Sequence, residues 1–592
     1  MRPPVWCRGD PPQEQKGSIM TAFRKMTQRS AFVIACLLVA LGALDLRAQV
    51  TSERLLRAAE EPQNWLTYSG NYTSNRYSTL RQIDPGNVKN LEQKWVYQGQ
   101  VMGNWQSTPL VVDGIMYVTQ RQNDVIALDA KTGRVFWIYR YVPNKDQKAC
   151  CGANNRGVAI LGDTLYMGTL DAHLIALDAK TGRPLWNLEI GNYDAGYSIT
   201  LSPLVVKDKV IIGVGGGELG IRGFIAAYDA RTGKEVWRFY TIPAPGEPGH
   251  ETWKTCPAGA STTLGSPTYC DPDAWKHGGG PVWMTGSYDP VLNLTYWGVG
   301  NPGPDWNNDQ RPGDNLYTDS VVALDPDTGR LKWHFQFTPN DTYDYDSVQV
   351  PVLVDMNWNG TPVKLLLWGN RNGYFYALDR ETGRFLLGKP FVKVNWSSGL
   401  DERGRPIPTP QPPGSPTFPG NQGGTNWYPP SYSPRTGLFY LSAWENYASI
   451  YQKVPQEYKE GRYFIGGLPT TLTPVPNAPG APTLARRPIN TWTEAVSKGA
   501  VLAIDPKTGD RKWRYEMTDV TDSGILVTAS DLLFTGGREG YFQALDARTG
   551  ALLWKASLGA QIVTGPMTYQ VDGKQYVATI SGINLVVFGL RE

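Results

Sequence analysis

The sequence predicts an all-β fold, an eight-bladed β-propeller. Three observations predict it: a turn motif that recurs seven times, strand-like segments around each copy, and a composition rich in turn-forming and aromatic residues. The 592 residues include 64 Gly, 45 Pro, 21 Trp and 31 Tyr. Gly and Pro favour tight turns, and aromatic residues favour strands, so this composition suits many short strands better than helices.

The recurring motif reads Ala-x-Asp-x-x-Thr-Gly-x-x-x-Trp. Its seven copies begin at Ala127, Ala176, Ala227, Ala323, Ala377, Ala503 and Ala544, and the fifth copy has Leu387 in place of the Trp. The Asp side chain can accept hydrogen bonds from turn N–H groups, and Gly can take a positive φ. Each copy is therefore predicted to be a hairpin whose Trp packs against the neighbouring unit.

The spacing of the copies gives the number of blades. Most neighbouring copies lie about 40 to 55 residues apart, which matches one four-stranded blade per repeat. Three further strands are predicted after the last copy, at 562–569, 575–580 and 584–588. Residues 94–97, Lys-Trp-Val-Tyr, resemble the strand that follows each repeat turn. This N-terminal strand is predicted to complete the C-terminal blade, so that seven repeats and one closing blade make eight.

Residues 49–592 are predicted to form a single propeller domain with insertions at about 241–280 and 401–490, which we expect to shape the substrate entrance. Residues 1–48 are predicted to hold upstream residues and a secretory signal peptide. Arg24, Lys25 and Arg29 precede an apolar run at 31–44, and a cleavage site precedes Gln49. Met20 or Met26 could be the true start, and an uncleaved membrane anchor is the alternative. The mature protein is expected to be soluble and periplasmic, without stable membrane insertion.

The charge balance argues against a nucleic-acid partner. Lys and Arg total 57, Asp and Glu total 54, and the net charge is +3. The sequence has no basic tract of the kind that binds nucleic acid.

Four cysteines carry structural predictions. Cys150 and Cys151 are adjacent, and in an oxidising compartment they can bond to each other. The alternative is that they are unpaired or bridged elsewhere. Cys256 and Cys270 flank the first insertion and are expected to form a disulfide, although His250 and His277 leave zinc as an alternative. No Cys-x-x-Cys-His sequence is present, so no covalent c-type haem is expected.

Oxygen-bearing side chains indicate a cation site. In an extended segment, Asp344 and Asp346 would point to the same face. Two such carboxylates repel each other unless a cation lies between them or one is protonated. One can then serve as a general base while the other binds a hard metal ion. The alternative is an acidic surface loop. Glu218 and Asn301 offer further oxygens of the kind that calcium or a trivalent ion prefers.

Glycines and a tryptophan indicate a flat ligand. Gly216 and Gly217 lie in GVGGGE, where a missing side chain lets the backbone approach a bound ring. A dinucleotide loop is disfavoured, because the spacing is wrong and a strand at 224–228 is expected to follow. Trp283, after three glycines, could supply a stacking face, and core packing is its alternative.

From about residue 60 to the end, the chain resembles the methanol and ethanol dehydrogenases that depend on pyrroloquinoline quinone (PQQ). The resemblance rests on motifs in the same order: CCGANNRG (150–157), GGGELGIRG (215–223), KHGGGPVW (276–283), GNPGP (300–304), TPNDTYDYD (338–346), GNRNGYFYALDR (369–380) and GGTNW (423–427). The fold that this resemblance implies, an eight-bladed propeller with tryptophan docking, agrees with the repeat count.

The resemblance also implies roles for individual residues. A Cys150–Cys151 disulfide would cover one face of PQQ, and Trp283 would stack on the other. The further cofactor-binding residues are Arg156, Thr200, Gly216, Gly217, Arg371, Asn426 and Trp427. Glu218, Asn301 and Asp344 match the metal ligands, and Asp344 is also the implied catalytic base. Asp346 matches the additional aspartate of the lanthanide-using branch, so one lanthanide or Ca²⁺ ion is expected.

The implied reaction is the oxidation of primary alcohols to aldehydes by hydride transfer to metal-bound PQQ. Electrons would then pass to a separate soluble or membrane-bound cytochrome c-type acceptor. Two alternatives are a non-catalytic propeller scaffold of the outer-membrane assembly type and a quinoprotein that acts on sugars or aldehydes. Three positions depart from the family pattern: Gln106 replaces a common Glu, Pro281 replaces a Thr of the methanol enzymes, and Asp522 replaces a Trp of the channel floor.

Overall fold

A computed structural model describes residues 50–591, apart from 255, 257–258, 265, 267–268, 413 and 471–497. The predicted signal peptide lies outside the described residues. Val50–Glu592 forms one unit, which holds every strand named below. Among the described residues, no helix has both the length and the apolar character needed to cross a membrane.

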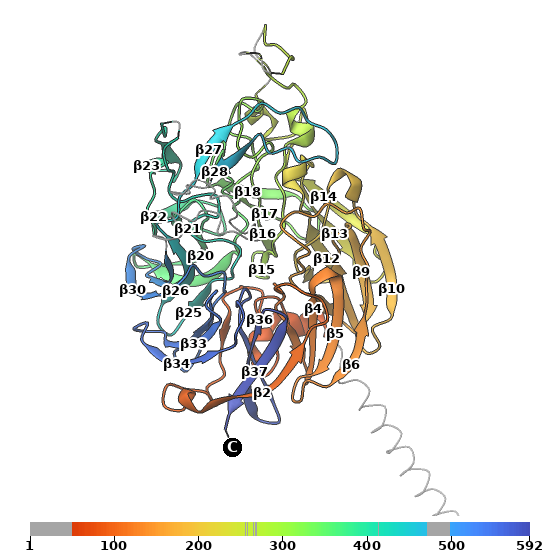
Figure 1. The fold of residues 1–592 in the computed structure, drawn as a ribbon, viewed down its shortest axis with the longest axis vertical. Helices are drawn as coiled ribbons and strands as arrows, with labels where there is room; N and C mark the ends of the chain where they lie inside the picture. The colour runs from red at the N-terminus through yellow and green to blue at the C-terminus, as the bar shows by residue number, and fades with distance from the viewer. Residues whose placement is uncertain are drawn as a thin grey trace, which may run out of the picture. The chain divides into compact units, whose positions relative to one another are not determined.

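The described chain forms eight four-stranded antiparallel blades and two small hairpins (Figure 1). Blades one to three consist of β3 (Leu110–Val112), β4 (Ile115–Gln120), β5 (Asp124–Asp129) and β6 (Val135–Tyr139); β7 (Ala159–Leu161), β8 (Thr164–Gly168), β9 (His173–Asp178) and β10 (Pro184–Glu189); and β11 (Leu204–Val206), β12 (Lys209–Gly213), β13 (Phe224–Asp229) and β14 (Glu235–Tyr240).

Blades four to six follow the same plan. They consist of β15 (Ser287–Asp289), β16 (Leu294–Gly298), β17 (Ser320–Leu324) and β18 (Leu331–Gln336); β19 (Val352–Trp358), β20 (Thr361–Gly369), β21 (Tyr374–Asp379) and β22 (Phe385–Pro390); and β25 (Ser431–Ser433), β26 (Leu438–Glu445), β29 (Lys498–Ile504) and β30 (Arg511–Glu516).

Blades seven and eight pair strands from the N-terminal part of the described chain with C-terminal strands. Blade seven consists of β31 (Leu526–Thr528), β32 (Leu532–Thr535), β33 (Tyr541–Asp546) and β34 (Leu552–Ser557), and the short strand β1 (Tyr77–Ser78) lies parallel to β31. Blade eight consists of β35 (Met567–Val571), β36 (Lys574–Ser581), β37 (Asn584–Leu590) and β2 (Leu91–Gln98).

Few residues lie outside the blades in regular structure. The hairpins pair β23 (Ser397–Leu400) with β24 (Pro406–Pro408) and β27 (Ile450–Lys453) with β28 (Gly467–Thr470). The helical segments are short: α2 (Ser52–Leu56), and the 3-10 turns η1 (Ala58–Glu60), η2 (Val88–Asn90), η3 (Arg121–Asn123), η4 (Tyr193–Ala195), η5 (Gly217–Leu219), η6 (His250–Thr252) and η7 (Ala274–His277).

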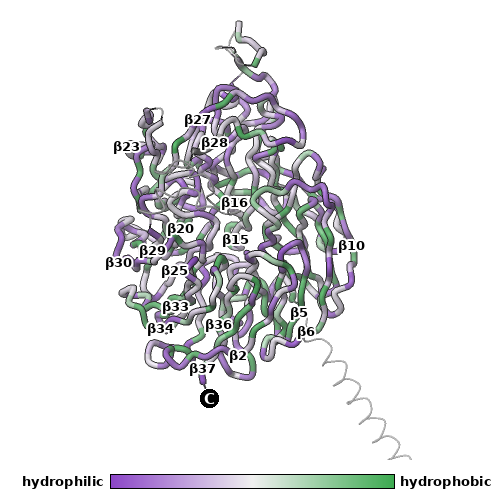
Figure 2. The backbone as a smooth tube through the Cα atoms, in the orientation of Figure 1, coloured by the Kyte–Doolittle hydropathy of each residue, from purple (hydrophilic) through white to green (hydrophobic). Residues whose placement is uncertain are grey.

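Burial falls from the first strand of a blade to the last. All three residues of β3 are buried, whereas every residue of β6 is at least partly exposed. Figure 2 colours β30, whose sequence is RKWRYE, mostly hydrophilic, and β5, whose sequence is DVIALD, mostly hydrophobic. The apolar strands therefore form the core between blades, and the fourth strands meet solvent.

The repeat motif forms the turn between the third and fourth strands, as predicted. In the first copy, Gly133 N donates to Asp129 O at 2.8 Å and Lys131 N donates to Asp129 Oδ1 at 2.8 Å. Gly133 has a φ of +74°, and an added Cβ would lie 2.6 Å from the Trp95 ring. Both the backbone conformation and the close indole therefore require glycine at this turn.

The tryptophans dock each blade on the next. Trp137 Nε1 of blade one donates to Ala179 O of blade two at 3.2 Å, and Trp237 Nε1 of blade three donates to Pro326 O of blade four at 2.8 Å. Where Leu387 replaces the Trp, its Cδ2 lies 3.5 Å from the Cβ position of Gly509. An apolar contact thus persists there without the indole hydrogen bond.

The predicted ring closure is confirmed. Strand β2 pairs antiparallel with β37, so the N-terminal strand is the fourth strand of blade eight. Trp95 of β2 donates from Nε1 to Ala130 O of blade one at 3.3 Å, which is the same docking contact that the repeats make. The structure therefore has the eight blades that the repeat count predicted.

Two expected boundaries differ from the structure. The strand predicted at 562–569 begins only at Met567, because residues 562–566 form an isolated bridge through Ile562 to Ser581 rather than a ladder. The insertion expected at 401–490 also contains β25 and β26, the first two strands of blade six. Proline-rich sequence on either side obscured the apolar run of β26.

The first insertion contains the predicted Cys256–Cys270 disulfide. The zinc alternative is wrong, because the two sulfurs bond to each other. His277 Nε2 instead contacts Asp271 Oδ2 at 2.8 Å, and His250 Nδ1 contacts Pro243 O at 2.9 Å.

Candidate active site

Cys150 and Cys151 lie in the loop that follows β6, and their sulfurs are joined in a disulfide. Cys151 is exposed, whereas Cys150 is half-buried. The two sulfurs and one carboxylate oxygen of Glu218 lie within 4.8 Å of one another. The disulfide therefore lies directly beside the Glu218 side chain. Because the sulfurs bond to each other, this trio is a contact and not a metal-binding set.

Glu218 lies in η5, at the end of the glycine run between β12 and β13. A Cβ added to Gly217 would lie 2.9 Å from Pro281 Cγ and 3.7 Å from Asn301 Oδ1. The bare Gly217 backbone thus allows the loop to pack directly against the segment that carries Asn301. Gly216, with a φ of +117°, turns the chain into η5.

Asn301, Asp346 and Asp344 are connected through Arg371. Asn301 N donates to Asp346 Oδ1 at 3.0 Å. Arg371 donates from Nη1 to Asp346 Oδ2 at 2.6 Å and from Nη2 to Asp344 Oδ2 at 2.9 Å. Arg371 Nε also donates to Asn421 O at 2.8 Å, so the guanidinium is fixed on both sides. The two aspartates therefore face the same guanidinium group.

The segment that carries these aspartates is not extended, contrary to the expectation from sequence. Asp344 has a φ of +62°. The cause is the buried carboxylate of Asp341, which accepts hydrogen bonds from Tyr343 N at 2.9 Å and Tyr345 N at 2.8 Å and so curls the chain. Both Asp344 and Asp346 still reach Arg371, so the shared orientation has a different origin from strand alternation.

The carboxylates in this site have raised pKa values. Burial raises the pKa of Glu218 to about 7, and the negative charge of Asp346 adds to the effect. Burial also raises the pKa of Asp344 well above its ordinary value; Arg371 opposes this shift, while Asp346 and Glu218 increase it. The protein therefore gathers more carboxyl groups here than Arg371 alone could balance if all were ionised.

Asp305 is a further buried carboxylate, and the sequence analysis missed it. Only 1% of the residue is exposed. Burial, and after it the charges of Asp344, Glu218 and Asp346, raise its pKa well above the ordinary value. The GNPGP motif ends one residue before Asp305, so a carboxylate directly after this motif was the signal that could have found it.

Arg156 forms the second part of the site. Its Nη1 donates to Thr200 Oγ1 at 3.0 Å, and its Cζ lies 4.9 Å from the ring centre of Trp283 and 5.0 Å from that of Trp427. Its Nε is buried without a hydrogen-bond partner, and no described carboxylate forms an ion pair with it. Burial lowers the pKa of Arg156 to about 10. A buried guanidinium with a free donor is suited to an anionic ligand.

The glycine loop, residues 215–217, connects the carboxylate part of the site with the part around Arg156. A Cβ on Gly215 would lie 3.9 Å from Trp283 Cβ, and three residues later Glu218 contacts the disulfide. Trp283 is half-buried, so part of its ring surface stays accessible. The loop therefore has the indole at one end and the two sulfurs at the other.

Asn426 and Trp427 border this region, with Asn426 held by its own loop. Asn426 Nδ2 donates to Gln422 O at 3.0 Å, and its Oδ1 accepts from Trp427 N at 2.8 Å.

Gln106, at one of the positions that depart from the family, has a buried Oε1 without a partner. Asp522, at another, accepts from Arg538 Nε at 3.1 Å.

The residues present fit the two groups that the resemblance implies. The free donor of Arg156 and the flat ring of Trp283 suit an anionic, planar quinone such as PQQ. The oxygen-bearing side chains of Glu218, Asn301, Asp344 and Asp346 are of the kind that a hard cation prefers. The donor chemistry of this site thus matches both an anionic ring and a metal ion.

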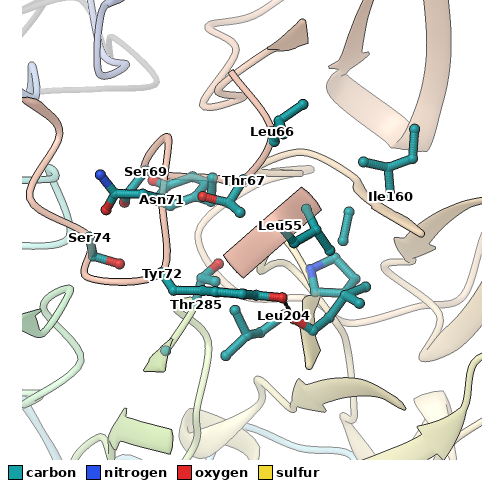
Figure 3. A pocket seen from close by; sticks show the side chains of 15 residues that line it. Leu55, Leu66, Thr67, Ser69, Asn71, Tyr72, Ser74, Ile160, Leu204 and Thr285 are labelled. Carbon is teal, nitrogen blue, oxygen red and sulfur yellow. Dashed lines mark hydrogen bonds between the residues drawn. The ribbon is translucent and has the colours of Figure 1, made fainter. Parts of the chain in front are cut away.

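A small cavity elsewhere does not compete with this site. It has a volume of about 20 Å³ and lies between the N-terminal segment and the strands around Leu204 and Ile160. Figure 3 shows Tyr72 and Leu55 lining it, and Tyr72 OH donates to Val205 O at 2.8 Å. A space of this size holds about one water molecule, so it is too small for a cofactor.

Comparison with known proteins identifies the family. Residues 65–398 and 516–577 match the family described as "PQQ: Glucose/ethanol/alcohol dehydrogenase, beta-propeller domain". The quinoprotein alcohol dehydrogenase PedH of Pseudomonas putida is 37% identical over 566 residues, which cover 93% of this chain and 91% of PedH. The lanthanide-dependent methanol dehydrogenase of Methylacidiphilum fumariolicum is 36% identical over 582 residues, 93% of this chain and 90% of that protein.

A solved structure agrees. The quinohemoprotein alcohol dehydrogenase ADHIIG of Pseudomonas putida superimposes with a TM-score of 0.81 at 34% identity, covering 92% of this chain and 83% of that one. These relatives are named as alcohol dehydrogenases, which decides against the non-catalytic scaffold. The chain therefore belongs to the PQQ-dependent alcohol dehydrogenase family of quinoprotein β-propellers.

Proposed function

We propose that this enzyme oxidises primary alcohols to aldehydes with PQQ and one hard cation, preferably a lanthanide, and passes electrons to a separate cytochrome c-type acceptor. Alcohol oxidation with PQQ follows from the family. The observation that carries the finer proposal is the network in which Arg371 donates to Asp344 and Asp346 while Asn301 N donates to Asp346.

The cofactor would lie between the Cys150–Cys151 disulfide and Trp283, along the glycine loop. Arg156, Thr200 and Arg371 would bind its carboxylate and carbonyl oxygens, and Gly216 and Gly217 leave room for the ring. Asn426 and Trp427 border the same space. The free Nε of Arg156 supports this arrangement, because a buried donor without a partner is costly until an acceptor arrives.

The cation would be held by Glu218, Asn301, Asp344 and Asp346. When bound, PQQ supplies a carbonyl that accepts a hydride, and the cation makes this carbonyl more electrophilic. The negative charge of these ligands exceeds what Arg371 balances, and this excess favours a trivalent ion over Ca²⁺. The lanthanide-dependent methanol dehydrogenase among the relatives supports the same preference.

Asp344 would act as the general base for the alcohol. Its side chain is partly buried, and Arg371 Nη2 fixes its Oδ2 at 2.9 Å, which leaves Oδ1 to accept the hydroxyl proton of the substrate. Arg371 keeps the carboxylate oriented before the substrate binds. The buried surroundings exclude water, so the proton of the alcohol is transferred to a positioned acceptor.

The electron acceptor and the compartment are proposed from the sequence. No Cys-x-x-Cys-His sequence occurs in the chain, which favours a haem on a separate protein. The basic and apolar pattern of residues 24–44 and the two disulfides support a periplasmic location.

Reconstitution tests this proposal. Purified protein is loaded with PQQ and either La³⁺ or Ca²⁺, and dye reduction is followed with primary alcohols, aldehydes and glucose. We expect the highest kcat/KM with primary alcohols and La³⁺, and we expect Asp344→Asn to abolish it. Asp309→Asn, which changes an exposed aspartate paired with Lys453, is the control. Activity confined to glucose or aldehydes, or no activity with either ion, would refute the proposal.

A further inference from the structure

The hairpin of β27 and β28 is inserted between the second and third strands of blade six, β26 and β29 (Figure 1). Its loop is closed by one side chain. Gln456 Oε1 accepts hydrogen bonds from Ile465 N at 3.0 Å and from Gly466 N at 2.9 Å. Val454 N also donates to Gly466 O at 2.8 Å. The loop therefore has a defined shape of its own.

The hairpin contacts two segments that carry proposed cation ligands. Tyr451 OH of β27 donates to Tyr343 O at 3.0 Å, directly before Asp344. Ile465 O accepts from Trp306 N at 2.9 Å, in the segment that follows the GNPGP motif. The hairpin of blade six is thus attached to loops of blades four and five beside the candidate active site.

A third contact reaches the loop of the Cys150–Cys151 disulfide. Gly461 has a φ of +68° and packs so closely on Asp194 O that an added Cβ would collide with this oxygen. The same carbonyl accepts a hydrogen bond from Lys148 Nζ at 2.7 Å. Because Lys148 lies two residues before Cys150, the hairpin and the disulfide loop meet at Asp194.

The fourth contact is made to Glu218 itself. Phe464 N donates to Glu218 O at 2.7 Å. Glu218 lies in η5, a single 3-10 turn held by Leu219 N to Gly216 O at 3.0 Å and by Gly220 N to Gly217 O at 2.8 Å. So short a turn has few hydrogen bonds of its own. A bond from outside the turn therefore restricts the Glu218 backbone substantially.

The side chain of Phe464 fixes the position of its own N–H. Only 1% of Phe464 is exposed. An added Cβ at Gly220 would lie 3.1 Å from Phe464 Cδ1 and 2.8 Å from Tyr458 Cε2, so both rings pack on the bare backbone after η5. The ring of His277, from the first insertion, stacks on Tyr458 at 4.3 Å and meets Phe464 edge-on at 5.3 Å. The two insertions thus enclose the Phe464 ring.

We infer that Phe464 is a positioning residue for Glu218. The enclosed ring holds the Phe464 N–H against Glu218 O, and this bond keeps the Glu218 carboxylate beside the disulfide, where one of its oxygens lies within 4.8 Å of both sulfurs. The inference rests on the proposed function, because Glu218 is proposed there as a cation ligand. Phe464 acts through Glu218, since a ligand that is held in place before the ion arrives binds it more tightly.

Crystal structures of the full-length parent and of Phe464→Ala, both without metal or PQQ, test the positioning directly. We expect the Glu218 oxygen to lie within 4.8 Å of the sulfurs in the parent and farther away in the variant. The reason is that the emptied ring position lets the Phe464 backbone shift. Phe464→Leu, which keeps a large buried apolar side chain, should leave Glu218 in place. Phe464→Val is the smaller truncation to use if the alanine variant does not fold.

Terbium binding tests the consequence for the cation. The protein is loaded with PQQ and titrated with Tb³⁺, and luminescence gives the affinity. We expect the Tb³⁺ affinity of Phe464→Ala to fall by about tenfold or more, as is typical when a residue that orients a metal ligand is removed. Phe464→Leu should recover most of this loss. The control is Tyr463→Ala, which changes the neighbouring aromatic residue, 56% exposed, and should keep the parent affinity.

The outcomes separate this inference from the proposed function. If the parent binds no Tb³⁺ when PQQ is present, the proposed cation site is refuted, and the crystal structures still decide whether Phe464 positions Glu218. If Phe464→Ala binds Tb³⁺ as tightly as a binding parent does, or if Glu218 has not moved in its structure, the positioning role is overturned. A thermal unfolding scan completes the comparison: a lower melting temperature with Glu218 in its parent position would assign Phe464 to fold stability alone.

Discussion

Arg371 Nη2 holds Asp344 Oδ2 at 2.9 Å, with only 5% and 18% of the two side chains exposed. This ion pair fixes the proposed base before any substrate arrives. The other Nη of Arg371 binds Asp346, so a single guanidinium determines the positions of two proposed cation ligands. The geometry depends on the planar, forked shape of arginine, which a lysine cannot reproduce.

Replacing Arg371 with lysine should therefore impair catalysis more than binding. A single ammonium group cannot donate to Asp344, Asp346 and Asn421 O in the same geometry, so the base loses its orientation. We expect kcat for alcohol oxidation to fall by about 100-fold or more, with a smaller change in KM. Steady-state kinetics of the reconstituted enzyme measure both, and the absorbance of bound PQQ reports cofactor retention.

The exposed Arg384, which pairs with Asp379, provides the control for this experiment. Arg384→Lys should leave kcat and KM unchanged. An Arg371→Lys enzyme with the parent kcat would show that the orientation of Asp344 does not depend on the guanidinium.

Replacing Asp346 with alanine should affect the two metals differently. The change removes one negative ligand, and a trivalent ion depends on such charge more than a divalent ion does. We expect La³⁺-dependent activity to be abolished, while Ca²⁺-dependent activity is reduced less. Titration of each ion, monitored by dye reduction and by calorimetry, gives the comparison. Equal activity of the variant and the parent with La³⁺ would remove the metal preference proposed here.

The raised pKa of Glu218 predicts a pH dependence of stability in the metal-free protein. Its folded-state pKa of about 7 exceeds the ordinary value of 4.5, so between these values the folded protein binds more protons than the unfolded chain. The stabilising contribution is complete below pH 4.5 and is lost as the pH rises through 7. Glu218 should thus lower the free energy of unfolding by up to about 1.4 kcal/mol per pH unit across this window.

Urea unfolding from pH 5 to pH 8 without metal or PQQ measures this slope. Glu218→Gln keeps the shape of the side chain and cannot titrate, so the difference between variant and parent isolates the contribution of Glu218. Parallel curves for the two proteins would contradict the raised pKa.

The blades could be predicted well from the sequence because each copy of the repeat marks the turn between the third and fourth strands of a blade. The Asp and Gly of each turn and the Trp that follows are local requirements, and seven copies repeat them. Residues 562–566 were misassigned to a strand because apolar sequence alone does not distinguish a ladder from an isolated bridge. Blade six was obscured for a similar reason, since its strands lie between proline-rich segments.

The site was predicted less completely because its geometry is not local. Asp344 and Asp346 were expected to align through strand alternation, whereas Asp341 curls the chain and Arg371 aligns them. Asp305 was missed although it directly follows the GNPGP motif, because the sequence does not show that its carboxylate is buried. Such contacts arise only when blades distant in the sequence meet.

Replacing Cys150 and Cys151 with alanine should act on the site and not on the fold. The disulfide joins adjacent residues and closes no long loop, so its loss adds little conformational entropy to the unfolded chain. Its sulfurs lie within 4.8 Å of a Glu218 oxygen, so their removal opens space beside the proposed cofactor. We expect weaker PQQ binding and at least about tenfold lower kcat/KM, with a melting temperature close to that of the parent. PQQ titration and calorimetry measure these effects.

The Cys256–Cys270 disulfide offers the opposite case, because it spans 14 residues of an insertion. Its replacement by alanines should lower the melting temperature and leave PQQ affinity unchanged. If both double variants lose only stability, the Cys150–Cys151 pair has no role at the cofactor.

Replacing Trp95 with alanine should destabilise the closed ring. The indole packs on Gly133 and donates to Ala130 O, so it joins blade eight to blade one. Truncation of a buried tryptophan costs about 3 to 5 kcal/mol through the cavity it leaves.

Leu387→Ala, at the interface of blades five and six, is the matched control, because it removes a smaller side chain without an indole hydrogen bond. We expect Trp95→Ala to lower the free energy of unfolding in urea by more than Leu387→Ala does. An equal loss of stability in the two variants would contradict this prediction. It would mean that Trp95 stabilises the contact between blades eight and one no more than Leu387 stabilises the contact between blades five and six.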